Sequence, residues 1–391
     1  MKAAFRELDI SRRSCVLHRL HNCVRDNVPY DGKKQPAQRF VHDMTVRCRK
    51  IAGHFHHSRP ATENWKKVCR EMKSESESCL LQDVKTRWDY TYLMLESFEK
   101  QKKVLKMYCS EYSTPEVLNN NDWELIPPTL FVLKPFKEIT LQLSYGGLIS
   151  MVYPKIRGLD LFMKSAQSDK NVYTKGVRGG LAAGLAKSVS ERFKDVLTLD
   201  DMHVGPACIL DPHYKDVFFS SQDLKVKAKD QLLGMTKETA ADNSNTQPES
   251  ESREEAPFNP YDLDYLLTSQ QDAPPLQTRE RSEAEVEIEQ YLSEPLLPLP
   301  KSTTLPNLQE QDPIQKTTKE QTVETLTYWK SNKNRFPCLY ALAQKLLAIP
   351  PSSADSERLF SQEGLIVTDK RNRLTAENAE RLVFISQNLE F

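Results

Sequence analysis

The sequence predicts a mostly α-helical protein, and three observations support this fold class. From Pro36 to His57 the apolar residues recur every three or four positions, which is the spacing of one helix face. The stretch from Trp88 to Tyr112 has the same period and includes a lysine-rich run. Residues 114–230 alternate further helical patterns with the breakers Pro127-Pro128, Gly146-Gly147 and Gly179-Gly180. This alternation predicts a bundle of helices.

Two regions depart from the helical pattern. Residues Cys79 to Val84 are β-prone, and we expect one short strand there. Beyond Gly234 the composition shifts to Glu, Ser, Thr, Gln and Pro, which predicts a disordered linker up to about residue 320. An apolar patch from Tyr261 to Leu267 and a short helical pattern from Arg281 to Leu292 interrupt this linker.

Structure is expected to return near Thr325 and to continue as three short helices. Pro337 begins the first, Ser352 or Ser353 caps the second, and Thr375 caps the third. Their apolar faces exceed what three short helices can cover among themselves. We therefore expect this region to bind a partner.

Charge is unevenly distributed along a chain whose net charge is zero. Residues 1–110 contain 23 Lys and Arg against 13 Asp and Glu, whereas residues 236–320 contain 7 against 18. The basic front and the acidic tract predict different partners.

Cysteine spacing and hydropathy argue against secretion and membrane insertion. The eight cysteines lack the dense, regular spacing of a disulfide framework and lie at positions 15, 23, 48, 69, 79, 109, 208 and 338. The first ten residues contain no apolar core of a signal peptide, and no run reaches the roughly 18 apolar residues that cross a bilayer. We expect reduced thiols and no membrane partner.

An ordered series of motifs occupies residues 325–389. It comprises Tyr328-Trp329-Lys330, Arg335-Phe336-Pro337, Leu346-Leu347-Ala348-Ile349-Pro350, Ser353-Ala354-Asp355-Ser356-Glu357-Arg358-Leu359-Phe360-Ser361 and Lys370-Arg371-Asn372-Arg373-Leu374. In order and spacing these motifs resemble the C-terminal dimerisation region of hAT-superfamily transposases. They are similar to those of vertebrate genes that descend from such elements and usually carry an N-terminal BED-type zinc finger.

The resemblance continues more thinly upstream. It includes Cys15-Val16-Leu17-His18, Asp83-Val84-Lys85-Thr86-Arg87-Trp88 and Ile209-Leu210-Asp211-Pro212-His213-Tyr214-Lys215, where the family usually has Arg-Phe in place of His213-Tyr214. It implies a truncated ribonuclease-H-like transposase core with a large helical insertion and a C-terminal helical dimerisation region. The expected boundaries are 1–112 for the core remnant, 113–232 for the insertion, 233–322 for the acidic linker and 323–391 for the dimerisation domain.

The resemblance also bears on catalysis, because active members bind divalent metal ions with two Asp and one Glu. Glu357 matches the third acid. The first two acids lie on strands that precede the Cys-x-x-His motif, and Met1 to Ala4 resemble the helix after the second acid. We expect Glu357 to be vestigial, the chain not to be an enzyme, and no cofactor. The simpler role for Glu357 is an acid that complements the dipole at a helix N-terminus.

Cys15 and His18 occupy matching positions of the family motif one helical turn apart, which could place a thiolate and an imidazole on one metal. Two ligands do not close a zinc site, which needs four. His21 and Cys23 could extend this set, and a second cluster consists of His54, His56 and His57, but neither has a C-x2-C pair at finger spacing. The family's BED finger would supply four, and these residues contain no such set. We therefore expect no metal, and buried or solvated side chains at these positions.

Trp88 matches a tryptophan that stacks on a flipped base in the active family. With the other acids missing, we favour a core role for Trp88. Weak, salt-sensitive and sequence-independent DNA contact is the expectation for the basic residues Arg47, Arg49, Lys50 and Arg87. A solvated charged surface is the simpler alternative.

The resemblance implies a nuclear, domesticated or truncated transposase-like protein that acts as a homodimer with weak, non-specific DNA association. The residues expected to mediate dimerisation are Leu346, Phe360, Leu382 and Val383. One alternative is an active transposase or nuclease, if a longer isoform supplies the missing acids. Another is a DNA-binding transcription regulator.

Overall fold

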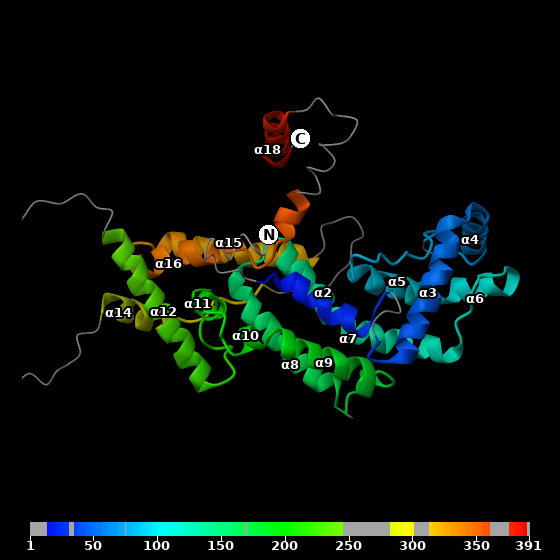
Figure 1. Cartoon of the computed structure of the whole chain (residues 1–391), viewed down its shortest axis with the longest axis horizontal. Coiled ribbons are helices and arrows are strands. Elements are labelled where there is room, and N and C mark those ends of the chain that lie inside the picture. Colours follow the sequence, from blue (N-terminus) through cyan, green and yellow to red (C-terminus); the bar gives the residue numbers. More distant parts are fainter. Residues whose placement is uncertain are drawn as a thin grey trace, which may run out of the picture.

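The computed structural model of the chain describes residues 14–30, 35–74, 76–168, 170–244, 282–300, 313–359 and 375–388. Every regular element within these ranges is a helix (Figure 1). The mostly α-helical fold class is therefore confirmed. None of the helices in these ranges is both long enough and apolar enough to cross a bilayer.

The N-terminal half supplies the long helices. They are α2 (Val16–Asn27), α3 (Arg39–His57), α4 (Arg59–Glu71), α5 (Asp89–Lys100), α6 (Lys102–Glu111) and α7 (Asn120–Ser144). Helices α3 to α6 gather at one end of the molecule, on the right in Figure 1. Helix α7 runs from that end toward the middle and contacts α2, α3, α5, α8 and α15.

Shorter elements follow. They are η1 (Ile149–Met151), α8 (Val152–Ala166), η2 (Val172–Thr174), η3 (Arg178–Ala182), α9 (Ala183–Arg192), α10 (Lys194–Leu197) and α11 (Val204–Ile209), and then the longer α12 (Gln222–Ser244). The remaining helices are α14 (Glu283–Ser293), α15 (Pro313–Asn332), α16 (Pro337–Leu347), a short turn over 354–359, and α18 (Ala376–Asn388). One apolar core extends from α2 through to α16.

The prediction that Pro127-Pro128 would end a helix is wrong, because both prolines lie inside α7. A proline lacks the N–H that would bond to the carbonyl four residues earlier, so each one removes a helix hydrogen bond. Two features offset this loss. A capping box between Asn119 and Asp122 closes the N-terminus, and the apolar face of α7, including Ile126, is buried.

The single helix expected from Trp88 to Tyr112 is also wrong in detail, because it divides at Gln101 into α5 and α6. The break lets Tyr108 of α6 pack edge-on against Phe55 of α3, with ring centroids 4.9 Å apart. The expected helix over 36–57 is confirmed as α3, whose buried face includes Met44, Cys48 and Ile51.

The strand expected over Cys79 to Val84 is not formed. The segment is extended, but its only ladder contact is an isolated bridge between Val84 and Arg87. A side chain bonds to its backbone instead, because the hydroxyl of Ser97 accepts from the Leu81 N–H at 3.1 Å. Just before the segment, the Trp65 indole donates to the Ser78 carbonyl at 3.2 Å. With no neighbouring strand among the described residues, extended backbone of this kind cannot form a sheet.

The glycine pairs behave differently from each other. Gly146 has φ +84°, a left-handed conformation that suits glycine, and it ends the turn after α7 as expected. Gly179-Gly180 does not break the chain's helical course, because both residues lie in the π-type turn η3 that leads directly into α9. A Cβ at position 180 would approach the Gln38 side chain to 2.7 Å, so close packing explains this glycine.

Helices continue into both ends of the predicted linker. Helix α12 extends to Ser244, and α15 begins at Pro313 rather than near Thr325. The predicted short helix is confirmed as α14, with a capping box between Ser282 and Glu285. Residues 245–281 and 301–312, including the Tyr261-to-Leu267 patch, lie outside the described residues.

The C-terminal helix boundaries follow the sequence closely. Pro337 begins α16 as predicted. A helical turn over 354–359 follows Ser352 and Ser353, and the Thr375 hydroxyl accepts from the Asn378 N–H at 3.3 Å to cap α18. The sequence also predicts that Gly364, a residue type that readily adopts the left-handed backbone, ends the second of the three helices, but this position lies outside the described residues.

Candidate functional site

The Cys-x-x-His motif, Cys15 to His18, lies close to Glu357, the residue that matches the third acid of the hAT transposases. Cys15 is the N-cap of α2 and His18 lies in its first turn, while Glu357 lies in the turn over 354–359. The His18 Nε2 is 3.8 Å from the Glu357 Oε1, and the Cys15 Sγ accepts from the Ser353 N–H at 3.4 Å. The sequence suggested these residues separately, and the fold brings them to one surface.

The surroundings of Glu357 are polar and open. Its carboxylate accepts a hydrogen bond from the Ser353 hydroxyl at 2.6 Å, and the His18 and Glu357 side chains are 63% and 58% exposed. Partial burial raises the pKa of the Cys15 thiol, but hydrogen bonds from Ser353 and His18 outweigh it and lower that pKa. In the part of the chain that the structure describes, no three His, Cys, Asp or Glu side chains are placed to hold a metal ion.

Arg49, expected to contact DNA, is buried instead. It is 8% exposed, and its Nε donates to the Asp83 Oδ2 at 2.7 Å. The Thr91 hydroxyl and the guanidinium of Arg25 complete the surroundings of Asp83, whose side chain is fully buried. Two buried cations therefore share one buried carboxylate, and this network fixes the segment that leads to Trp88.

Trp88 is 2% exposed, in agreement with the core role that the sequence favoured. Its ring meets Phe136 of α7 edge-on, with centroids 6.4 Å apart. Arg87 is exposed, and its carbonyl accepts from Arg25 at 2.9 Å. Of the two adjacent candidates, only Arg87 presents a side chain to solvent.

Arg47 and Lys50 each face a carboxylate from the loop and helix that follow α6. The Arg47 guanidinium binds Asp122 with two hydrogen bonds, at 3.0 and 2.5 Å, and Lys50 lies 2.7 Å from Glu116. Hydrogen bonding to Asp122 raises the pKa of Arg47. Both cations are therefore partly neutralised within the chain.

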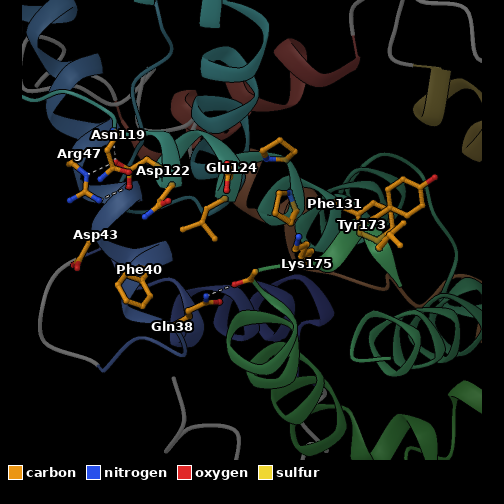
Figure 2. Close-up of a pocket in the computed structure, with 16 residues that line it drawn as sticks. Gln38, Phe40, Asp43, Arg47, Asn119, Asp122, Glu124, Phe131, Tyr173 and Lys175 are labelled. Carbon is orange, nitrogen blue, oxygen red and sulfur yellow. Dashed lines mark hydrogen bonds and ion pairs between the residues drawn. The ribbon is translucent and has the colours of Figure 1, made fainter. Parts of the chain in front are cut away.

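The Arg47–Asp122 pair forms one wall of a large groove (Figure 2). The groove has a volume of about 1030 Å³ and lies between the start of α3, the N-terminal half of α7 and the loop around η2. Phe40 of α3 is 72% exposed at one side, and Tyr173 stacks on Phe131 at the other, with centroids 5.2 Å apart. No sequence pattern indicates this groove, because its walls come from three distant segments.

A second buried network centres on the Asp-Pro-His-Tyr-Lys motif after α11. The His213 imidazole lies 2.9 Å from Asp211 and 3.1 Å from Glu324 of α15, and Ser150 donates to Asp211 at 2.7 Å. Lys215, 2% exposed, donates to the carbonyls of Tyr291 and Glu294, which lie at and just beyond the end of α14. The motif thus joins the middle of the chain to α14 and α15.

The expected dimerisation residues divide into two groups. Leu346 is 4% exposed and belongs to the core of the single chain, so it is not on a free surface. Leu382 of α18 is 39% exposed, and its neighbours Phe384 and Ile385 are 67% and 44% exposed. Phe360 and the Val383 side chain lie outside what the structure describes.

Two family models match this chain, one in its N-terminal part and one in its C-terminal part. Residues 287–389 match the hAT family C-terminal dimerisation region, and residues 14–128 match the ZBED1 RNase-like helical domain. The chain is a relative of the hAT transposases and the zinc finger BED proteins. The matched dimerisation region of this hAT relative contains α15, α16 and α18.

Three relatives illustrate the range of proteins to which this chain is similar. Zinc finger BED domain-containing protein 4 of Homo sapiens is 26% identical over 359 residues, covering 90% of this chain and 28% of that protein. The putative transcriptional regulator tpeD of Talaromyces stipitatus is 25% identical, covering 92% and 38%. The putative AC transposase of Zea mays is 23% identical, covering 82% and 38%. The chain therefore spans well under half the length of each.

Proposed function

We propose that this hAT relative acts as a nuclear protein that self-associates through its C-terminal helices and contacts DNA weakly, without cutting it. One observation carries the self-association: α18 has three exposed apolar side chains, Leu382, Phe384 and Ile385, inside a region that matches a family dimerisation region. Burying an exposed leucine or phenylalanine contributes about 1.5–3 kcal/mol each. Burial of these side chains by a second copy would therefore stabilise the dimer.

The test measures the mass of the full chain by light scattering over a range of concentrations. We expect a dimer for the native chain and a monomer for Leu382→Asp/Ile385→Asp. The matched control is Val226→Asp in α12, where Val226 is 48% exposed, and it should remain dimeric. A native chain that is monomeric at every concentration would contradict the proposal. Point variants are preferable to truncation, because Trp329 and Phe336 belong to the core.

The weak DNA association is supported by fewer residues than the sequence suggested. Arg47, Arg49 and Lys50 contact carboxylates. Arg87, just before α5, and Lys103, in α6, are exposed. Contacts from so few cations favour salt-sensitive binding with little sequence preference. Nuclear localisation is part of this proposal, because a DNA-associated protein needs access to DNA.

The absence of cutting is inferred from the surroundings of Glu357. Its carboxylate accepts from Ser353 and faces the imidazole of His18, an arrangement that suits a structural role at a helix start. Two-metal chemistry needs several carboxylates that converge from different elements. The proposal concerns the chain of 391 residues.

Two alternatives remain, and both concern a longer product. An active transposase or nuclease needs two further aspartates on strands. A transcription regulator, which is what the name of tpeD calls that relative, needs a DNA-reading domain. Mapping the 5′ end of the transcript distinguishes them. Encoded strands with two aspartates would favour the first alternative, and a BED finger alone would favour the second. A transcript that encodes neither feature would favour our proposal.

A further inference from the structure

Helix α15 is built the opposite way from an ordinary surface helix. Its inward face is mainly polar: Thr318, Gln321 and Thr325 are buried, together with Trp329. Thr325 contacts Asp211 at 3.2 Å, and the Trp329 indole donates to the Leu210 carbonyl at 2.7 Å. The apolar side chains that a core would ordinarily take, those of Val323 and Leu326, point outward.

The outward face of α15 combines apolar and cationic side chains. Val323 and Leu326 are 61% and 49% exposed. Three exposed lysines share their face at helical spacing, and we name the set the α15 outer face: Lys316, Lys319, Val323, Leu326 and Lys330. Among the described residues no carboxylate forms an ion pair with these three lysines. The face therefore suits an acidic segment that also carries apolar side chains.

The chain itself contains such a segment. Residues 258–267 read Phe-Asn-Pro-Tyr-Asp-Leu-Asp-Tyr-Leu-Leu, in which two carboxylates stand among six large apolar or aromatic side chains. This segment includes the apolar patch from Tyr261 to Leu267 in the acidic tract, and it lies outside the described residues. We propose that the α15 outer face binds residues 258–267 of the same chain, with Asp262 and Asp264 opposite the lysines and the leucines over Val323 and Leu326.

The distance along the chain permits this contact. From Leu267 to Glu283, where α14 begins, the separation is 283 − 267 = 16 residues, which span at most about 55 Å when extended. Helix α14 packs against α16, and α16 packs against α15. Because the segment is tethered, its effective concentration at the face is high, on the order of millimolar, so a modest affinity suffices.

Two other occupants fit the face less well. Phosphates would pair with the lysines, but they would leave Val323 and Leu326 exposed between the contacts. A second copy of the chain would cover the apolar pair, but the dimer proposed above is carried by α18 and not by α15. The segment 258–267 matches both the charge and the apolar character of the face.

The test places the photo-crosslinking residue p-benzoylphenylalanine at Tyr261 in the full chain and identifies crosslinked peptides by mass spectrometry. We expect crosslinks within one chain to residues 316–330. Lys319→Glu/Lys330→Glu should lower their yield about fivefold, the scale of two lost surface ion pairs. Reversing the partners as well, with Asp262→Lys/Asp264→Lys, should restore the yield. Leu326→Asp should lower it, and Val226→Asp on α12 should not.

Three results would overturn the inference. Crosslinks between isotopically light and heavy chains would assign the face to a second copy. Loss of crosslinking on adding duplex DNA, with DNA affinity lost in Lys319→Glu/Lys330→Glu but kept in Leu326→Asp, would assign it to phosphates. Crosslinks that are spread over the molecule, or that survive every variant, would show that no site exists there. Since Lys319, Lys330, Leu326 and Val226 are exposed, circular dichroism of the variants at these four positions should show an unchanged fold.

Discussion

The imidazole of His213 and the carboxylate of Asp211 lie 2.9 Å apart, and both side chains are fully buried. Glu324 of α15 lies on the other side of the ring, 3.1 Å from Nε2. Burial lowers the pKa of His213, but hydrogen bonding to Asp211 and then to Glu324 outweighs it and raises that pKa above its usual value. At position 213 this chain thus has a titratable imidazole, where the hAT transposases that it resembles usually have arginine.

The network predicts a fold whose stability falls as the pH rises. Because the folded-state pKa of His213 exceeds the unfolded value near 6.5, its contribution is complete below about pH 6.5 and is lost as the pH rises through the raised pKa. Urea unfolding between pH 6 and 9 measures this. His213→Gln should make the free energy of unfolding less dependent on pH over this range. His56→Gln, at an exposed site in α3, should leave the pH dependence unchanged. Stability that rises over this window in the native chain would contradict the prediction.

Asp83→Asn should destabilise the fold strongly. The substitution leaves Arg25 and Arg49 buried without their shared carboxylate, and a broken buried ion pair costs about 3–5 kcal/mol. The midpoint of chemical unfolding measures the loss. Glu63→Gln removes the partner of the exposed Arg59 and should change stability by less than about 0.5 kcal/mol. Equal effects of the two variants would mean that the buried network contributes little.

Leu346→Ala and Leu382→Ala should have opposite signatures. Leu346 is buried in the core, so its truncation should cost about 2–5 kcal/mol of stability and leave the dimer's dissociation constant unchanged. Leu382 is exposed, so its truncation should weaken the dimer and leave the unfolding of the monomer nearly unchanged. Calorimetry and sedimentation equilibrium measure the two quantities. If Leu346→Ala weakened the dimer and left monomer stability unchanged, Leu346 would belong to the dimer interface.

DNA retention on filters at low salt should be weak and should fall steeply as salt rises, because phosphate contacts release counterions. Replacing the exposed Arg87 by alanine should reduce the slope of log affinity against log salt by about 1. Lys345→Ala, on the far helix α16, serves as the charge-matched control and should leave the slope unchanged. Preference for one site by more than about a thousandfold would be inconsistent with non-specific contact.

Purified chain should not nick or join duplex DNA that carries hAT-like terminal repeats, with either Mg²⁺ or Mn²⁺ present. Glu357 faces an imidazole and a hydroxyl, and two ions about 3.5–4 Å apart need several converging carboxylates. Gel analysis for nicks and hairpins checks this. Metal-dependent cleavage that disappears in Glu357→Ala would show that the acid still acts in catalysis.

Local pattern was sufficient where a helix is defined by its own residues. The apolar period of α3, the Pro337 start of α16 and the Thr375 cap of α18 are all short-range signals, and each is confirmed. The same reasoning failed at Pro127 in α7, because burial against neighbouring helices outweighed the lost hydrogen bond. Propensity does not report such long-range compensation.

The site was less predictable than the fold, because partners distant in sequence decide whether a charge is free. Arg49 pairs with Asp83 over 34 residues, and Arg47 pairs with Asp122 over 75. A count of basic residues in one segment cannot detect these carboxylates. Motif resemblance did better, since it singled out Cys15, His18 and Glu357, but only the fold shows that they are neighbours.

The contact between Cys15 and Ser353 also has a consequence for biosynthesis, because 338 residues separate its two ends. A ribosome adds about 5–20 residues per second, so α2 emerges roughly 20–70 s before its partner is made. During that interval the thiol at the start of α2 has no Ser353 amide to bind. Chaperones that shield nascent apolar helices therefore have a long period in which to act on this end of the chain, and the final closure waits for translation of residues 353–357.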